Sequence, residues 1–250
     1  MSPELHHQVL DTSGPLSTPA SVMTVGAHPD DAEFGAGATL FRWTASGAVA
    51  TIVIATDGAK GSWDPRIGDS DLVARRRREQ VSAAAVLGAQ SVAWLGQSDG
   101  ELRHMPTLRK AIASLIRKHR PDVVLTHDPW QRYQLHPDHR TTGMLVIDAV
   151  VAAREPRFYP DQGLDAHRPT ALLLWSADDP DHAEPVDDRA FDAKVEALLC
   201  HTSQSETTMG NAAASGAARE RFVRQIDEDL RLRGEAFDLD RAETFKRITP

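Results

Sequence analysis

Histidine and aspartate cluster at two places in the chain, each shortly after an apolar run. The first cluster, Ala-His-Pro-Asp-Asp at 27–31, follows the run 22–26, and the second, His-Pro-Asp-His at 136–139, comes after the run 123–126. Imidazole nitrogen and carboxylate oxygen are ligands that suit zinc. If each run is a buried parallel strand, both clusters lie at carboxyl ends of strands, where open α/β sheets bind ligands. The pattern predicts one shared metal site and a metal-dependent hydrolase.

A catalytic zinc ion takes three protein ligands and leaves one position open for water. His28 and Asp31 can supply two ligands, and either His136 or His139 can supply the third. Asp30 would then lie beside the water, whose pKa zinc lowers to about 7, and can carry its proton to the leaving group. The spare histidine can stabilise the oxyanion of a tetrahedral intermediate. Fe²⁺ or another divalent ion also fits two histidines and one carboxylate.

These clusters need a scaffold, and apolar runs alternate with amphipathic segments along the chain. Strands are expected at 22–27, 49–54, 91–95, 123–126 and 170–175, and helices at 34–46, 71–87, 106–118, 141–153, 191–200 and 217–230. The order predicts an α/β fold with a Rossmann-like, mostly parallel sheet flanked by helices, and a helical and irregular C-terminal extension. Residues 180–188 are expected to be irregular, and 202–215 to form a mobile flap.

The composition narrows the class of protein. The chain has 250 residues, of which 41% are apolar, so we expect a single packed domain at 21–250. Residues 1–20 contain Ser-Gly-Pro and Thr-Pro and are expected to form a flexible arm. A net charge of −8 argues against nucleic acid as the main partner. The single cysteine, Cys200, excludes an intrachain disulfide and a thiolate metal cage, and fits a cytoplasmic location. No apolar run reaches the roughly 20 residues that span a bilayer. The sequence does not determine whether the protein forms a homo-oligomer.

The two clusters together resemble the PIG-L/LmbE family of zinc-dependent de-N-acetylases, which act on N-acetylglucosamine conjugates. Softer matches at 76–79, 99–102 and 201–204 extend the resemblance from about residue 21 to the C-terminal end. The resemblance implies a small amino-sugar substrate that is cleaved to a free amine and acetate. Many members carry glutamate directly after the paired aspartates, whereas here Ala32 occupies that place and Glu33 follows. This difference bears on the subgroup and the substrate rather than on the zinc site.

Carried over by position, the resemblance implies roles for the residues of both clusters. His28, Asp31 and His139 would bind zinc. Asp30 would be the general base and the acid that protonates the departing amine. His136 would stabilise the oxyanion.

Three more residues are expected to contact the substrate. Arg76 falls three residues before a glutamate, where the family often has a substrate-binding arginine, although the arginines at 75–78 leave the register open. Asp99 falls where the family often has a polar residue near the sugar or its histidine partner. Tyr133, in a loop close to the second cluster, could stack on a sugar together with Trp63 and Trp130, although half-buried packing is the commoner role of aromatic residues.

Two alternatives remain beside the deacetylase. An amidase that cleaves a sugar-linked thiol conjugate would use the same zinc chemistry. A Rossmann-like nucleotide- or sugar-binding module without catalysis would explain Gly35 and Gly37, but Leu40 stands where the dinucleotide fingerprint needs its third glycine. Failure to bind any divalent metal would favour that module.

Other polar residues near the motifs are expected to have structural roles. Asp138 is expected to be a cap or a support for a ligand rather than a ligand, and His201 to bond with Gln204, the backbone or the substrate. Four histidines are expected at the surface: His104, His119, His167 and His182.

Overall fold

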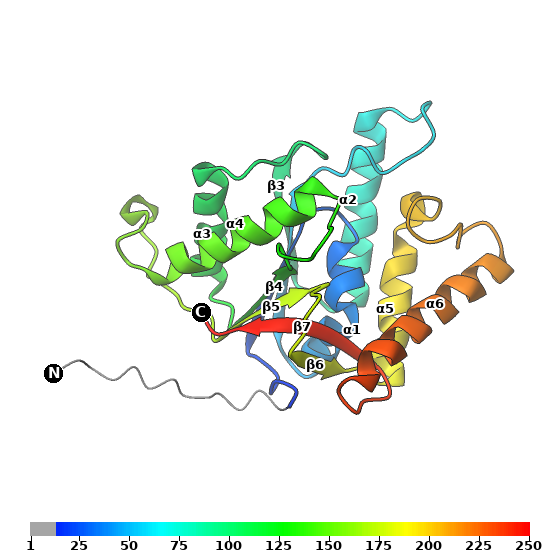
Figure 1. Cartoon of the computed structure of the whole chain (residues 1–250). Helices are drawn as coiled ribbons and strands as arrows, with labels where there is room; N and C mark the ends of the chain where they lie inside the picture. The colour runs from blue at the N-terminus through cyan, green and yellow to red at the C-terminus, as the bar shows by residue number, and fades with distance from the viewer. Residues whose placement is uncertain (1–13) are drawn as a thin grey trace.

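The structure, a computed structural model, describes residues 14–250. Its centre is a seven-stranded sheet in the order β3-β2-β1-β4-β5-β7-β6 (Figure 1). The strands are β1 (Ser21–Gly26), β2 (Val49–Thr56), β3 (Ser91–Gln97), β4 (Val123–His127), β5 (Ala171–Trp175), β6 (His182–Pro185) and β7 (Ala242–Ile248). The first five run parallel, while β7 pairs antiparallel with both β5 and β6. The predicted α/β fold with a mostly parallel sheet is confirmed.

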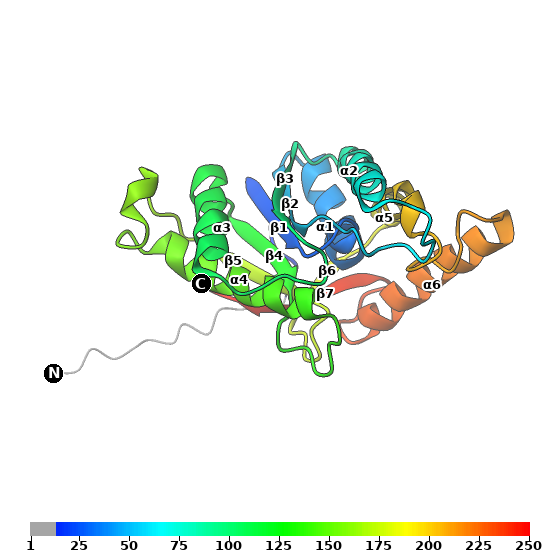
Figure 2. The ribbon, with the colours of Figure 1, turned by 90° about the horizontal axis from the view of Figure 1, so that it is seen from above.

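Helices cover both faces of the sheet. They are α1 (Asp31–Ala45), α2 (Asp69–Val86), α3 (Pro106–His119), α4 (Pro137–Arg154), α5 (Asp188–Cys200) and α6 (Gly216–Glu235), with short 3₁₀ turns at Pro160–Gln162 and Thr202–Gln204. One face carries α3 and α4, and the other carries α1, α2 and α5 (Figure 2). Each of the six predicted helices is present. Because α1 and α4 begin about one turn earlier than predicted, parts of both clusters lie in first helical turns.

The middle strands are apolar because they are buried on both faces. In β1, Met23 and Val25 pack toward α3 and α4, whereas Val22 packs toward α1. The chain runs from β1 outward to β2 and β3, and then returns to place β4 on the other side of β1. Val25 of β1 is in register with Thr126 of β4, so the residues that follow these two strands lie side by side. This reversal of strand order is where α/β sheets form their ligand crevice.

Residues from the C-terminal part of the chain stabilise a break in the helix α1. Ala36 has a non-helical φ of −152°, which leaves polar backbone groups unpaired on both sides of it. Lys194 of α5 donates to the carbonyl oxygens of residues 33–34, and Glu243 of β7 accepts from the N–H groups of residues 38–39. The ammonium and the carboxylate lie 2.6 Å apart and both side chains are almost fully buried. This ion pair therefore fixes the first turn of α1, which begins at the first cluster.

Two predictions about the end of the chain are wrong, and one strand there was not predicted. Residues 180–188, expected to be irregular, contain β6, and no strand was predicted where β7 lies. His182, expected at the surface, is 1% exposed because it lies 2.7 Å from the buried carboxylate of Glu184. A four-residue strand with two buried ionisable groups lacks the apolar alternation that marks a strand.

Part of the expected N-terminal arm contacts the sheet. Residues 1–13 of that arm lie outside the described residues. Within 14–20, the N–H of Leu16 donates to the Glu184 carboxylate at 2.8 Å, and Pro19 is buried. Among the described helices, none is long and apolar enough to cross a membrane.

The close approach of α4 to the end of β4 depends on Gly143. A Cβ at this position would come within 2.6 Å of the carbonyl oxygen of His127 and 2.9 Å of the Pro129 ring. We expect Gly143→Ala to lower the free energy of unfolding by about 1–3 kcal/mol, measured by chemical denaturation. Gly216→Ala is the matched control, because a Cβ there meets nothing within 4 Å. Equal stability of the two variants would contradict this packing.

Candidate metal centre and its surroundings

A cavity of about 510 Å³ opens at the carboxyl ends of β1 and β4. Its volume lies in the usual range for small-molecule sites, about 300–1,000 Å³. Its floor carries both clusters: His28, Asp30, Asp31, His136 and His139. Its outer wall comes from the loop 57–68, from the loop that follows α5, and from the helix α6. The residues that line this wall are Trp63, Gln204, Thr207, Thr208, Ile226, Asp229 and Arg233.

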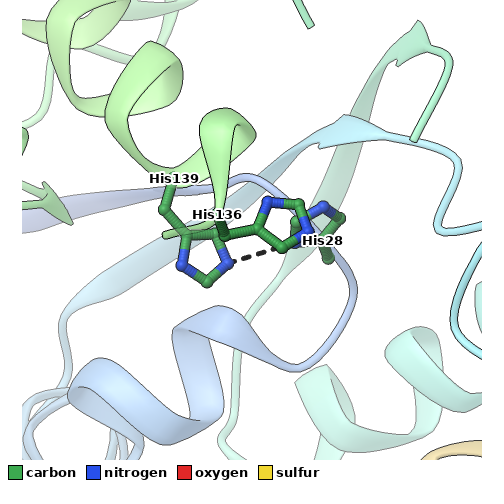
Figure 3. Close-up of side chains that lie close together, drawn as sticks. All are labelled: His28, His136 and His139. Carbon is green, nitrogen blue, oxygen red and sulfur yellow. Dashed lines mark hydrogen bonds between the residues drawn. The ribbon is translucent and has the colours of Figure 1, made fainter. Parts of the chain in front are cut away.

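Ligand atoms of His28, Asp31 and His139 lie at pairwise distances that suit a metal ion, with a different oxygen of Asp31 facing each imidazole. His28 Nδ1 is 3.3 Å from His139 Nε2 and 3.6 Å from Asp31 Oδ2, and His139 Nε2 is 3.4 Å from Asp31 Oδ1. Figure 3 shows the imidazoles of His28, His136 and His139 gathered at this point, with the contact between His28 and His139 dashed. Ligands held at zinc bond lengths in a tetrahedron are about 3.3–3.6 Å apart. The donor set therefore fits zinc in atom type, and each pair of its side chains has the spacing of zinc ligands.

Apart from this set, in which Asp31 presents both of its oxygens, the described residues offer three compact groups of potential ligands, counting one atom per residue. They are His28 with His136 and His139; Asp31 with His127 and His139; and His28 with Asp99 and Asp138. The hydrogen bonds around each group show which atoms already have partners.

The second ring nitrogen of His28 faces two buried carboxylates. Its Nε2 is 3.1 Å from Asp99 and 3.2 Å from Asp138. Burial lowers the pKa of His28, but hydrogen bonds that the ring donates to Asp138, Asp31 and Asp99 outweigh it and raise the pKa well above its usual value. Asp138 also accepts the N–H groups of Gly100 and Leu102, which fixes its carboxylate. A carboxylate behind a histidine is the common arrangement that orients an imidazole toward a metal.

His127, which the sequence analysis did not single out, orients Asp31. Its Nδ1 accepts the indole N–H of Trp175 at 3.0 Å. Because an indole only donates, Nε2 carries the proton of the neutral ring and donates to Asp31 Oδ2, 3.0 Å away. The signal in the sequence was a histidine directly after the run 123–126, at the strand end where the second ligand cluster was expected.

Asp30 presents a buried carboxyl group to the cavity. The residue is 5% exposed, its Oδ2 accepts no hydrogen bond, and the nearest cation is the Arg76 guanidinium at 3.6 Å. Burial raises the pKa of Asp30 to about 6, although Arg76 lowers it. A carboxyl group with a pKa near neutrality can both take up and release a proton at ordinary pH.

His136 caps α4 and faces the same space. Its Nδ1 accepts the N–H of Asp138 at 3.3 Å, so the neutral ring carries its proton on Nε2. Burial and the charge of His28 lower the pKa of His136, which favours this neutral form. His136 can therefore donate a hydrogen bond to an oxygen in the cavity.

The structure brings together seven of the eight residues expected at the site. Of the arginines at 75–78 only Arg76 is buried, and it faces the first cluster. Asp99 lies behind His28 and also borders the cavity. Tyr133 is not brought in, because it is 85% exposed and does not line the cavity, whereas Trp63 does.

The segment 202–215 is tied to α2 at its beginning. Glu79 accepts the hydroxyl groups of Thr202 and Ser203 at 2.8 and 2.5 Å. Gln204 donates to the carbonyl oxygen of Gly61 and lines the cavity. The His201 side chain is fully buried 3.7 Å from Glu33 and does not line the cavity, while its carbonyl oxygen accepts the N–H of Gln204 at 2.9 Å.

Comparison with known proteins places this fold and these residues in a family. Residues 23–150 match the PIG-L family, described as GlcNAc-PI de-N-acetylase. Diacetylchitobiose deacetylase of Thermococcus kodakarensis is 35% identical over 193 residues, which cover 76% of this chain and 72% of that protein. The structure of N,N'-diacetylchitobiose deacetylase from Pyrococcus horikoshii matches with a TM-score of 0.85 and 28% identity, over 96% of this chain and 88% of that one.

A further relative is 1D-myo-inositol 2-acetamido-2-deoxy-alpha-D-glucopyranoside deacetylase 2 of Saccharopolyspora erythraea. It is 29% identical over 166 residues, which cover 56% of this chain and 60% of that protein. The similarity thus spans less than two thirds of the length of this relative.

His139 belongs to two of the three ligand groups, so its removal tests the centre. We expect about one divalent ion per wild-type chain after dialysis and loss of that ion in His139→Ala, measured by plasma mass spectrometry. His104→Ala is the control, because His104 is half-exposed and pairs with Asp148. Full metal content in His139→Ala would shift the centre to His28, Asp99 and Asp138.

Proposed function

Because the chain belongs to the PIG-L family of de-N-acetylases, we propose that it is a zinc-dependent hydrolase that removes the acetyl group from an N-acetylglucosamine conjugate. The observation that carries this proposal is the group of His28, Asp31 and His139, in which each pair of side chains has ligand atoms within 3.6 Å of each other, beside the buried carboxyl of Asp30. The products are acetate and a free amine on the sugar.

His28, Asp31 and His139 are the proposed zinc ligands. The partners of the neighbouring groups support this choice, because His127 donates to Asp31 while Asp99 and Asp138 hold the far nitrogen of His28. When bound, the ion supplies Lewis acidity, which polarises an acetyl carbonyl and makes water a nucleophile at neutral pH. Two imidazoles and one carboxylate also suit Fe²⁺, and the metal content measurement distinguishes the two elements.

The chain's own groups handle the protons and the developing charge. Asp30, whose side chain borders the cavity, takes a proton from the attacking water. It then gives that proton to the amine nitrogen as the C–N bond of the amide breaks, which its pKa of about 6 permits. His136 donates its Nε2 proton in a hydrogen bond to the acetyl oxygen as negative charge develops there.

The base assignment is tested by Asp30→Asn, which keeps the shape of the side chain but cannot accept a proton. We expect kcat for acetate release to fall by about 10²–10⁴-fold, the usual contribution of general acid–base catalysis. Metal content should equal that of the wild type, because Asp30 is not a proposed ligand. Turnover near the wild-type rate would rule out Asp30 as the base.

The charges around the cavity support a neutral conjugate as substrate. Every lysine or arginine that lines it has an acidic side chain within 4 Å: Lys60 with Asp69, Arg76 with Asp30, Lys194 with Glu243 and Arg233 with Asp229. Arg76, Lys194 and Arg233 are therefore engaged by acidic partners, and Lys60 shares an exposed carboxylate at 3.9 Å, so the lining adds little net positive charge for a phosphate or carboxylate. Trp63 offers an exposed aromatic face and Thr207 and Thr208 offer hydroxyl groups, a combination that suits a second sugar ring.

The proposed function and substrate class are tested together by measuring acetate release from two substrates. We expect kcat/KM for N,N'-diacetylchitobiose to exceed that for N-acetylglucosamine 1-phosphate by about tenfold or more, because the phosphate would lose water without gaining a free cation. Preference for the phosphate would contradict the neutral conjugate. Inactivity of the metal-loaded enzyme on both substrates would contradict the deacetylase proposal for this class of sugars.

A further inference from the structure

Asp30 adopts a backbone conformation that aspartate rarely takes. Its φ of 97° and ψ of −21° lie in the left-handed region. Such a conformation costs about 1–3 kcal/mol in a residue other than glycine and persists only where the surroundings impose it. The side chain of Asp30 makes no capping hydrogen bond of its own to α1. The groups that impose this conformation must therefore come from elsewhere in the chain.

Two side chains of α2 hold both ends of the peptide group that joins Pro29 to Asp30. Arg76 Nη2 donates to the Pro29 carbonyl oxygen at 2.7 Å, and the N–H of Asp30 donates to Gln80 Oε1 at 3.1 Å. Because Arg76 and Gln80 are four residues apart, they project from the same side of the helix. Both are buried, at 3% and 0% exposure. The orientation of this peptide plane is therefore set from α2.

Glu33 determines which way the amide of Gln80 points. Gln80 Nε2 donates to Glu33 Oε1 at 2.5 Å, which leaves the amide oxygen to face the N–H of Asp30. The other oxygen of Glu33 lies 3.7 Å from His201 Nε2. Glu33, Gln80 and His201 are all fully buried, so water cannot substitute for these contacts. Two hydrogen bonds thus lead from Glu33 through Gln80 to the backbone of Asp30, with His201 packed behind Glu33.

We propose that Gln80 is a positioning residue for deacetylation: with Glu33 behind it, Gln80 holds the Pro29–Asp30 peptide so that the Asp30 carboxylate faces the cavity. The proposal rests on the proposed function, in which Asp30 is the base. It gives a role to Glu33, which the sequence analysis left without one. It also explains how a carboxyl that accepts no hydrogen bond at Oδ2 keeps a fixed direction.

The first test is Gln80→Met, which keeps the length of the side chain and removes both hydrogen bonds. Misplacement of a catalytic group by about 1 Å can cost 10²-fold, so we expect kcat to fall by about 10–100-fold. KM should change by less than about twofold, because Gln80 does not line the cavity, and metal content measured on the same sample separates loss of the ion from misplacement of Asp30. A crystal structure of the variant should show Asp30 outside the left-handed region.

The matched control is Gln90→Met. The Gln90 amide oxygen also accepts a backbone N–H, that of Ala50, but at the opposite end of the strands. We expect Gln90→Met to leave kcat unchanged. Wild-type kcat in Gln80→Met, or a left-handed Asp30 in its crystal structure, would overturn the proposal. The crystal structure tests it even if the wild type proves inactive on the sugars tried, which would contradict only the proposed function.

Exchange of the glutamine and the glutamate between positions 80 and 33 gives a second test, which also applies if Gln80→Met does not fold. Gln80→Glu alone places two carboxylates against each other and should lower kcat. In the double variant Gln80→Glu/Glu33→Gln, the amide at position 33 donates to the carboxylate at position 80, which still accepts the N–H of Asp30. We expect the double variant to recover at least about tenfold in kcat over Gln80→Glu, since coupled residues give non-additive effects. No recovery in the double variant would overturn the proposal.

Discussion

The site depends on one constraint, which is that an ionisable group taken out of water must find a partner. His28, Asp30, Asp31, Asp99 and Asp138 are each at most 9% exposed and lie within one small region. Each partner comes from a different part of the chain, such as α2 for Asp30, the end of β4 for Asp31 and the loop after β3 for Asp138. The cluster therefore forms only when the whole sheet and both helical layers are in place.

The same constraint organises the structure away from the cavity. Lys194 and Glu243 satisfy the broken first helix and thereby join α5 and β7 to the element that begins at the first cluster. Gly35 contributes by its lack of a side chain, since a Cβ there would lie 2.5 Å from the Trp175 ring. This close approach lets Trp175 reach His127, which in turn orients Asp31. The packing of the fold and the electrostatics of the site are thus linked through the same few residues.

The sequence predicts those features whose cause is local. The apolar runs of β1 and β4 come shortly before their clusters in the chain. The end of the sheet that carries the site and seven residues around the cavity could therefore be anticipated. What could not be anticipated depends on partners distant in sequence: His127 needs Trp175, β6 and β7 carry buried charges, and His182 is buried against Glu184. Likewise, four consecutive arginines are equivalent in the sequence, and only the packing of α2 selects Arg76.

The central claim is that one metal ion joins the two clusters through His28, Asp31 and His139. Anomalous X-ray diffraction from crystals of the purified enzyme, recorded on both sides of the zinc absorption edge, tests this most directly. We expect a single strong zinc peak bonded to His28 Nδ1, Asp31 and His139 Nε2, with His127, Asp99 and Asp138 in contact with these ligands and not with the ion. A peak bonded to Asp99 and Asp138, or no peak in an enzyme that still releases acetate, would contradict it.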